Sequence, residues 1–142
     1  MLTVRDRLMD FMSPEKRSKI MRSIGSKNTK PELAIRHLVH SLGYRYRLHN
    51  KKLPGKPDLT FSSKRKVIFV HGCFWHQHKD CSAGKIPASR IEYWKPKLER
   101  NVTRDIDNQR KLAESGWDVL IIWECEIENI DLIIKRIKEF LE

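Results

Sequence analysis

Two short apolar runs constrain the fold of this chain more than any other feature. Residues 66–70 read KVIFV and residues 117–123 read WDVLIIW. Short runs rich in β-branched side chains, bounded by turn-forming residues, are typical of buried strands. A helical pattern follows the first run and another follows the second. Strands and helices therefore alternate in the second half of the chain, as they do in α/β proteins.

Capping residues and glycines set the limits of the helices. Ser13-Pro14 and the capping boxes TKPE and SRIE each predict a helix start. Pro96 is expected to kink or restart the third helix. The order ααβββαβα predicts an α/β fold, with a mixed central sheet and helices on both faces. The expected helices cover residues 14–24, 30–42, 89–115 and 127–141, and the expected strands cover 44–49, 58–61, 66–70 and 117–123.

The charge of the chain is uneven. The formal net charge of its 142 residues is +11. Residues 1–66 hold 17 Lys/Arg and 5 Asp/Glu, whereas residues 67–142 hold 12 and 13. Such an asymmetry indicates a surface that binds a polyanion, and nucleic acid is the commonest polyanionic partner. A solvated basic surface without a partner is the competing interpretation.

Several protein classes do not fit the sequence. No run of about 18 apolar residues is present, so we expect no membrane span. The first residues carry charges within their apolar stretch and do not resemble a signal peptide. Three cysteines cannot all pair, so we expect reduced thiols that serve as ligands, in a cytoplasmic protein. The length fits one domain over residues 14–142, preceded by a flexible extension over residues 1–13.

The loop HGCFWHQHKDC, residues 71–81, concentrates groups that bind metals or carry protons. His78 and Cys81 have two residues between them, which is a chelating spacing for tetrahedral zinc. Cys125, just after the last strand, is the expected third ligand. The spacing leaves the fourth ligand open among Cys73, His76, Asp80 and Asp105. Simple burial of the thiols is the alternative.

Three further residues are candidates for catalysis. Asp58 begins a short strand, and the next strand ends at Val70-His71, so a hairpin would bring the carboxylate near His71. A carboxylate of this kind can hold a hard cation such as Mg²⁺. A neutral imidazole can accept a proton from water near neutral pH, which makes His71 or His76 a candidate general base. A core histidine and an ordinary turn aspartate are the alternatives.

Aromatic residues accompany these groups. Phe74 and Trp75 are adjacent in the loop, and Trp94 follows within twenty residues. Aromatic side chains among basic residues can stack on bases or wedge between them. Core packing is the competing interpretation, and it is the better one for Trp117 and Trp123.

Taken together, these residues resemble a known family. VIFVHGCFWHQHKDC, LPGKPD, EYW, NVTRD and LIIWEC occur here in the same order as in the very short patch repair endonucleases. The similarity covers roughly residues 14–130. It implies a restriction-endonuclease-like core, and an enzyme that nicks DNA 5′ of the thymine in T:G mismatches produced by deamination of 5-methylcytosine. It also implies catalytic Mg²⁺ and a structural zinc.

The resemblance assigns roles residue by residue. Asp58 and the backbone carbonyl of Val70 would hold Mg²⁺, His71 and His76 would be the active-site histidines, and Glu32 would be an acidic residue near them. It also selects Asp105 as the fourth zinc ligand and leaves Cys73 as a packed thiol. The implied zinc ligands are His78, Cys81, Asp105 and Cys125. The implied DNA-binding residues are Met21, Phe74, Trp75, Trp94, Lys97 and Asn101.

The chain departs from the family pattern in places. Val70 replaces a threonine, the loop has one residue more before Cys81, and residues 1–13 have no counterpart. The expected partner is double-stranded DNA bound by a monomer, with mismatch-repair proteins and a cytosine-5 methyltransferase in the same pathway. Two other functions compete with this one. They are a restriction-type nuclease of other specificity and a zinc-dependent DNA-binding module without catalysis.

Overall fold

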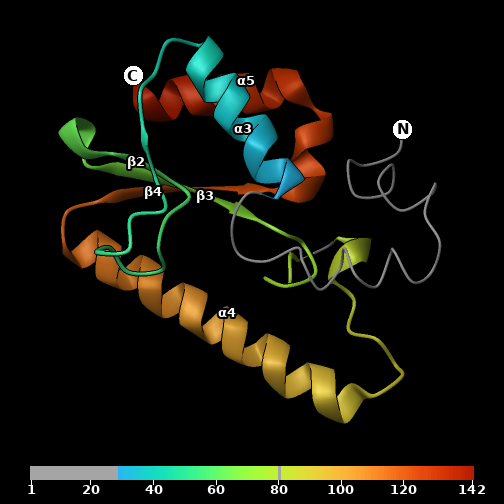
Figure 1. The fold of residues 1–142 in the computed structure, drawn as a ribbon. Helices are drawn as coiled ribbons and strands as arrows, with labels where there is room; N and C mark the ends of the chain where they lie inside the picture. The colour runs from blue at the N-terminus through green and yellow to red at the C-terminus, as the bar shows by residue number, and fades with distance from the viewer. Residues whose placement is uncertain (1–28, 80) are drawn as a thin grey trace.

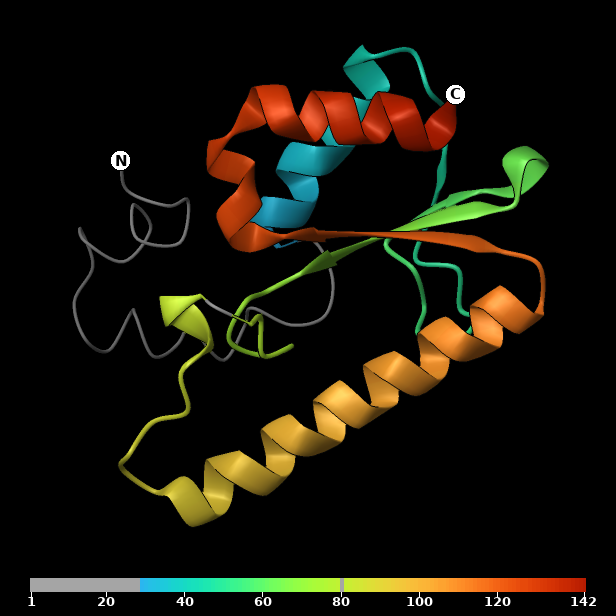
Figure 2. The same cartoon turned by 180° about the vertical axis from the view of Figure 1, so that it is seen from behind.

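A single mixed sheet, covered by helices on both faces, organises the molecule. The computed structural model describes residues 29–79 and 81–142. In Figure 1, α3 and α5 cover one face of the sheet and α4 crosses the other, and the view from behind in Figure 2 shows the same layers. The α/β fold expected from the sequence is therefore confirmed. The elements are α3 (Lys30–Ser41), β1 (Arg47–Leu48), β2 (Leu59–Phe61), η1 (Ser62–Lys64), β3 (Lys66–His71), η2 (Ser82–Gly84), α4 (Ile91–Glu114), β4 (Asp118–Trp123), η3 (Glu124–Glu128) and α5 (Ile130–Leu141).

The sheet has the strand order β1-β2-β3-β4. β1 pairs with β2, and β2 with β3, in antiparallel fashion, whereas β3 and β4 are parallel. The parallel pair runs from Lys66 opposite Asp118 to His71 opposite Trp123. Because α4 connects the two parallel strands, β3 and β4 end at the same edge of the sheet. Residues that follow these strands are thereby brought together.

Alternation along β3 divides the core into two layers. Ile68 lies in the larger cluster under α3 and α5, whereas Val67 and Phe69 lie in the smaller cluster with Leu112 of α4. Successive side chains of a strand point to opposite faces, so both faces of β3 are buried. His71 has the parity of Val67 and Phe69. The strand therefore directs His71 toward the α4 side of the sheet.

Several element boundaries differ from those expected from the sequence. β1 is limited to two residues because the backbone N–H of Tyr44 bonds the carbonyl of Val39 and His49 adopts a left-handed conformation. The predicted cap at Ser89 was wrong, since Arg90 is the N-cap residue and makes no side-chain capping bond. α4 continues through Pro96 rather than restarting there. The helix expected over residues 14–24 lies outside the described residues, as does the extension 1–13.

A glycine fixes the loop that leads to Asp58. Gly55 has φ +77°, and a Cβ there would lie 3.1 Å from the ring of Phe69 and 3.2 Å from Cβ of Asn108. A side chain here would crowd Phe69 and Asn108 and would stand on a left-handed backbone, so glycine suits this position best. Pro57 and Asp58, which follow, are buried. The helix start expected at Thr29 is confirmed, because the Glu32 N–H donates to the Thr29 hydroxyl. The Glu32 carboxylate of the expected capping box contacts Arg36 and His49.

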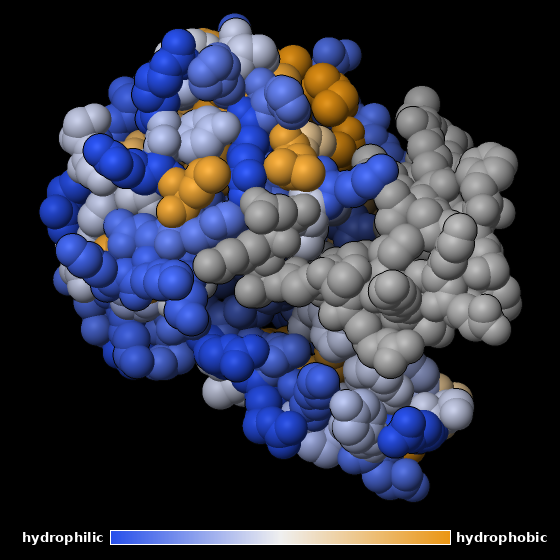
Figure 3. Space-filling view, viewed as in Figure 1, coloured by the Kyte–Doolittle hydropathy of each residue, from blue (hydrophilic) through white to orange (hydrophobic). Residues whose placement is uncertain are grey.

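Hydrophilic residues cover most of the face shown in Figure 3, and apolar residues appear there in small groups. None of the helices described combines the length and the apolar character that crossing a membrane requires.

Candidate functional site

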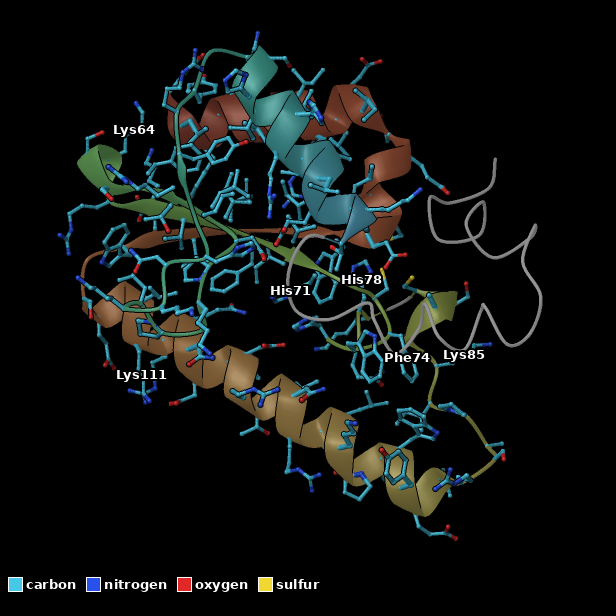
Figure 4. The ribbon with its side chains drawn as sticks, viewed as in Figure 1. Lys64, His71, Phe74, His78, Lys85 and Lys111 are labelled. Carbon is cyan, nitrogen blue, oxygen red and sulfur yellow. The ribbon has the colours of Figure 1, made fainter. Side chains whose placement is uncertain are left out.

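The loop after β3 carries most of the candidate site. Its backbone is tightly wound, because the N–H of His76 bonds the carbonyl of Gly72 and the N–H of His78 bonds the carbonyl of Cys73. Gln77 takes a left-handed φ of 51° within this turn. His76 and His78 consequently reach different partners. In Figure 4, His71, His78 and Phe74 gather near one end of the sheet, far from Lys64 at the other end.

Two histidines and an aspartate form the first group, which we call the His–Asp cluster: His71, His76 and Asp105. The rings of His71 and His76 are stacked, with centroids 3.8 Å apart. Nδ1 of His76 lies 2.6 Å from Oδ2 of Asp105. A carboxylate only accepts, so in the neutral imidazole form Nδ1 carries the proton and Nε2 keeps its lone pair. His76 is thus oriented as a proton acceptor.

His71 differs from His76 in its surroundings. It is only 5 % exposed, and among the described residues nothing hydrogen-bonds its buried Nδ1. Burial, followed by the charge of His76, lowers the pKa of His71 to about 3. Desolvation disfavours the imidazolium form. His71 is therefore neutral at physiological pH, with a polar atom available to a ligand.

Two acidic residues and a histidine form the second group, the acidic cluster: Glu32, His49 and Asp58. Glu32, from the first turn of α3, is 2 % exposed, and its carboxylate contacts Arg36 and His49. Asp58 is 9 % exposed. Burial and a hydrogen bond with Glu32 raise the pKa of Asp58 to about 8, although the N–H of Val70 acts in the opposite direction. Two buried carboxylates that share a proton are suited to a cation.

Val70 connects the acidic cluster to the His–Asp cluster. Its backbone N–H donates to Oδ2 of Asp58 at 2.7 Å, and His71 is the next residue. The structure therefore brings Asp58, Glu32, Val70 and His71 to one strand end, as the sequence indicates. The bond to Asp58 uses the Val70 backbone, and the Val70 side chain packs against the core under α3 and α5.

Three thiols and an imidazole form the third group, the Cys–His cluster: Cys73, His78, Cys81 and Cys125. Nδ1 of His78 lies 3.7 Å from Sγ of Cys73 and 3.4 Å from Sγ of Cys125. Ligands of a tetrahedral zinc stand about 3.5–3.8 Å apart, given metal–ligand distances of about 2.0–2.3 Å. Burial raises the pKa values of Cys73 and Cys125. These four residues can hold a metal ion.

The fourth member of this group differs from the sequence-based prediction. Asp105 was expected beside His78, but its carboxylate contacts His76 in the His–Asp cluster, and Cys73 stands with the other thiols. The physical reason is the tight turn, which places the carbonyl of Cys73 and the N–H of His78 in one hydrogen bond. Cys73 and His78 are thereby carried to the same side.

The expected DNA-binding aromatics form a continuous group beside α4. Phe74, Trp75 and Trp94 make edge-on or tilted ring contacts with centroids 5.0 to 5.9 Å apart. The Lys97 ammonium lies 5.6 Å from the Trp75 ring and 5.9 Å from the Trp94 ring. Asn101 donates to the backbone carbonyl of Trp75 at 3.2 Å. Met21 lies outside the described residues.

Sequence reasoning did not identify three residues of the site. His49 and Arg36 contact Glu32, and Trp123 contacts two of the clusters. Trp123 was expected in the core, but its ring meets His71 edge-on and stacks on His78. A signal for His49 was present, because a histidine at the end of a strand is also what marked His71.

Known proteins resemble this chain over most of its length. A family model described as "DNA mismatch endonuclease Vsr" matches residues 9–83. The "Type II nicking enzyme V.XorIIP" of Xanthomonas oryzae pv. oryzae is 48% identical over 135 residues, which is 95% of this chain and 98% of that protein. The "DNA mismatch endonuclease Vsr" of Escherichia coli K12 is 42% identical over 122 residues, covering 86% of this chain and 78% of that protein.

A solved structure agrees on the fold. The catalytic domain of the homing endonuclease I-Bth0305I superposes with a TM-score of 0.57 at 22% sequence identity. The superposition covers 80% of this chain and 94% of that domain. The core is therefore restriction-endonuclease-like, as the sequence predicts. With the family model matching more than half of its residues and relatives aligned along nearly all of it, the chain belongs to the Vsr family of DNA mismatch endonucleases.

Proposed function

We propose that this protein nicks duplex DNA 5′ of the thymine in a T:G mismatch left by deamination of 5-methylcytosine, and so starts very short patch repair. One observation carries the proposal. The acidic cluster and the His–Asp cluster flank the same strand end, where Val70 bonds Asp58 and His71 follows. A phosphodiester bound at this edge would meet carboxylates on one side and a proton acceptor on the other.

The acidic cluster fits Mg²⁺ by the chemistry of its donors. Asp58 and Glu32 offer hard carboxylate oxygens, which Mg²⁺ prefers. Burial and then the hydrogen bond with Glu32 raise the pKa of Asp58, and a bound cation would favour its ionised form. Asp58 and the carbonyl of Val70 would hold the ion, and Glu32 would lie beside them. When bound, Mg²⁺ would stabilise the negative charge that develops on the phosphoryl and leaving oxygens.

The histidines would perform the proton transfer. His76 accepts a proton from the attacking water at Nε2, because Asp105 holds the proton of Nδ1. Asp105 then stabilises the imidazolium that forms. His71 remains neutral because it is buried, and its Nδ1, which no described residue hydrogen-bonds, can bond the phosphate or a water. The stacked His71 ring also fixes the plane in which the His76 ring lies.

The aromatic group and the basic residues would provide DNA binding. Phe74, Trp75 and Trp94 would enter the duplex beside the mismatch, where a wobble pair costs less to unstack than a Watson–Crick pair. Lys97, over two of these rings, would approach a phosphate or a base edge. Asn101 would hold the Trp75 backbone in place and approach the mismatched pair. We propose the same wedge role for Met21 as the sequence suggested.

The Cys–His cluster fits zinc. Three soft thiolates and one imidazole are a common donor set for a closed structural site. We propose His78, Cys81, Cys125 and Cys73 as the ligands, with Cys73 in place of Asp105. Zinc would close the loop that carries His76 and Trp75 onto the end of β4. A monomer acting on bacterial cytoplasmic DNA, in one pathway with mismatch-repair proteins and a cytosine-5 methyltransferase, completes the proposal.

Strand-specific nicking of mismatched duplex tests this function. Purified protein with Mg²⁺ would be given labelled duplexes that carry one T:G or one T:A pair in several methylation-site contexts. We expect a nick only in the thymine strand of the T:G duplex, and none by Asp58→Ala. Equal cutting of T:A duplex would indicate a restriction-type nuclease of other specificity. Tight binding without cutting in any context would indicate a DNA-binding module.

A further inference from the structure

His49 links the two carboxylates of the acidic cluster through two separate contacts. Its Nε2 lies 2.9 Å from Oε1 of Glu32. Its backbone N–H donates to the carbonyl of Asp58 at 3.3 Å. Glu32 belongs to α3 and Asp58 immediately precedes β2, so His49 connects a helix to the strand beside it.

The strained backbone conformation of His49 suggests that its side chain has a specific role. His49 has φ +46°, in the left-handed region. Glycine or asparagine adopts this conformation at the lowest cost, and other residues there carry a strain of order 1 kcal/mol or more. Histidine is among the types that tolerate it. A side chain that is only 15 % exposed, placed on a strained backbone and aimed at a buried carboxylate, is consistent with a selected contact.

The chemistry of the contact favours donation by His49. A carboxylate accepts hydrogen bonds only, so Nε2 carries the proton that it gives to Glu32. Arg36 contacts the other oxygen, Oε2, and its Nη2 also lies 3.3 Å from the same Nε2. A guanidinium only donates, so Nε2 cannot accept from Arg36 while it donates to Glu32, and the shorter contact of 2.9 Å favours donation to Glu32. Glu32 is therefore held at both oxygens while its carboxyl group meets Asp58. With its lone pair replaced by a proton, Nε2 is a donor to Glu32 and not a ligand for a hard cation.

We propose that His49 is a positioning residue for the acidic cluster. It holds Glu32 in the rotamer that faces Asp58, and it thereby fixes the position of Glu32 relative to the Asp58 carboxylate that would hold the divalent cation. The inference rests on the proposed function, because it assigns His49 a role at the metal site described there. Groups that orient metal-binding residues typically change metal affinity by 10–100-fold when they are removed.

Two substitutions separate the side-chain contact from the backbone turn. His49→Gln keeps an N–H donor the same number of bonds from the backbone as Nε2. His49→Asn also keeps an amide and suits the left-handed φ, but its donor falls short of Glu32. We expect His49→Asn to weaken cation binding by roughly 10–100-fold and His49→Gln to restore most of it. Both variants should unfold near the wild-type temperature, because they keep an amide side chain and differ only in how far its N–H extends from the backbone.

Mn²⁺ alone provides a readout that does not depend on nicking. Full-length zinc-loaded protein would be titrated with Mn²⁺, and free Mn²⁺ followed by electron paramagnetic resonance, with Asp58→Asn as the reference for loss of the site. Equal Mn²⁺ affinity in His49→Asn and wild type would overturn the inference but leave the metal site in place. The same conclusion would follow if His49→Gln bound Mn²⁺ as weakly as His49→Asn. If the bound Mn²⁺ showed coupling to an imidazole nitrogen, and this coupling were lost in His49→Gln, His49 would be a direct metal ligand and not a positioning residue.

The titration also separates failure of this inference from failure of the proposed function. Wild type that binds Mn²⁺ no better than Asp58→Asn would overturn the metal site itself, and the inference with it. Binding that is lost in Asp58→Asn, weakened in His49→Asn and restored in His49→Gln supports both.

Discussion

The Cys–His cluster and the His–Asp cluster are built from one short loop, yet they have opposite characters. Cys73 and His78 enter the first, and His71 and His76 enter the second, so each cluster takes two residues that stand five apart. The Cys–His cluster is a complete set of soft ligands. The His–Asp cluster pairs one histidine with a carboxylate, and no described residue hydrogen-bonds Nδ1 of the other histidine. The same loop therefore supplies a closed site and an open one.

The difference shows how one tight turn can supply residues to a metal-binding cluster and to a separate cluster suited to proton transfer. The interleaved positions face opposite sides because the backbone is wound through two loop hydrogen bonds. Trp123 forms the boundary, with its ring 5.1 Å from that of His71 and 4.2 Å from that of His78. A metal bound by the Cys–His cluster would hold the turn in shape. Because the same turn carries His76, the His–Asp cluster would then keep its geometry without binding a metal itself.

Removal of His76 should have the largest effect and should affect only the open site. We expect His76→Ala to lower the rate of nicking by about 10²–10⁴-fold, the usual cost of removing a general base. The side chain is 29 % exposed, so its loss should change the unfolding temperature little. Single-turnover nicking of T:G duplex, with zinc content and thermal unfolding measured in parallel, checks both statements.

His40→Ala provides the matched control, because His40 is exposed on α3 and contacts neither cluster through its side chain. Full activity in His76→Ala would contradict its role as a proton acceptor. A loss of zinc from His76→Ala would show that the two clusters are not separate.

The choice between Cys73 and Asp105 as the fourth metal ligand should give the next largest effect. It also tests which residues belong to which cluster. Cys73→Ser should lose zinc and unfold at a lower temperature, because a structural site contributes folding free energy. If His76 is the proposed base, Asp105→Asn should keep its zinc and lose roughly 10–100-fold in nicking, because Asp105 orients the His76 ring. Metal analysis by mass spectrometry and nicking assays on both variants make the comparison.

The opposite pattern, with zinc lost from Asp105→Asn and kept in Cys73→Ser, would restore the ligand set that the sequence suggested. Cys81→Ser serves as the reference for a ligand that both assignments include.

Much of the fold could be predicted from the sequence, because its signals are local or periodic. The apolar runs became β3 and β4, and Thr29 caps α3 as expected. Boundaries failed where longer-range bonds decide, as at Tyr44, whose N–H returns to the preceding helix. Family resemblance supplied the residues at the strand ends, and the structure brings Asp58 and His71 together.

The rest could not be predicted because it depends on how the loop is wound. Spacing along the chain left the fourth metal ligand open among Cys73, His76, Asp80 and Asp105. The bond from the His78 N–H to the carbonyl of Cys73 brings Cys73 to the other thiols, whereas Asp105 contacts His76. His49 stands nine residues before Asp58 in the sequence, and strand pairing brings the two together. Contacts of this kind can be predicted only when it is known which residues of neighbouring strands lie opposite each other.

Trp75 belongs to the same loop but to neither cluster, so its loss should separate DNA binding from both. We expect Trp75→Ala to weaken binding of a T:G duplex by about 1–3 kcal/mol, the usual value of stacking on one base. Trp75→Phe should keep part of the binding because it keeps a π face. Fluorescence anisotropy with labelled duplex measures the change. Weakened binding accompanied by loss of zinc would show that the ring supports the loop instead.

The pH dependence of stability should give the smallest effect, and it compares the acidic cluster with His71. In the folded protein Asp58 has a pKa of about 8, against 3.8 ordinarily, so the folded state keeps a proton that the unfolded chain releases. Its contribution to stability is complete below pH 3.8 and is lost as the pH rises through 8. His71 has a pKa of about 3, against 6.5 ordinarily, so its contribution is complete above 6.5 and is lost as the pH falls toward 3.

The two slopes oppose each other between about pH 4 and 6.5, and above that range only the slope of Asp58 remains. Without added Mg²⁺, the free energy of unfolding of the wild type should fall by about 1–2 kcal/mol between pH 6.5 and 8, since one pH unit corresponds to about 1.36 kcal/mol per proton. Asp58→Asn should lack this fall, and His71→Gln should extend it downward toward pH 4. Urea unfolding at several pH values measures the slopes. Parallel curves for wild type and Asp58→Asn would mean that Asp58 is ionised in the folded protein, and that Glu32 and Asp58 share no proton.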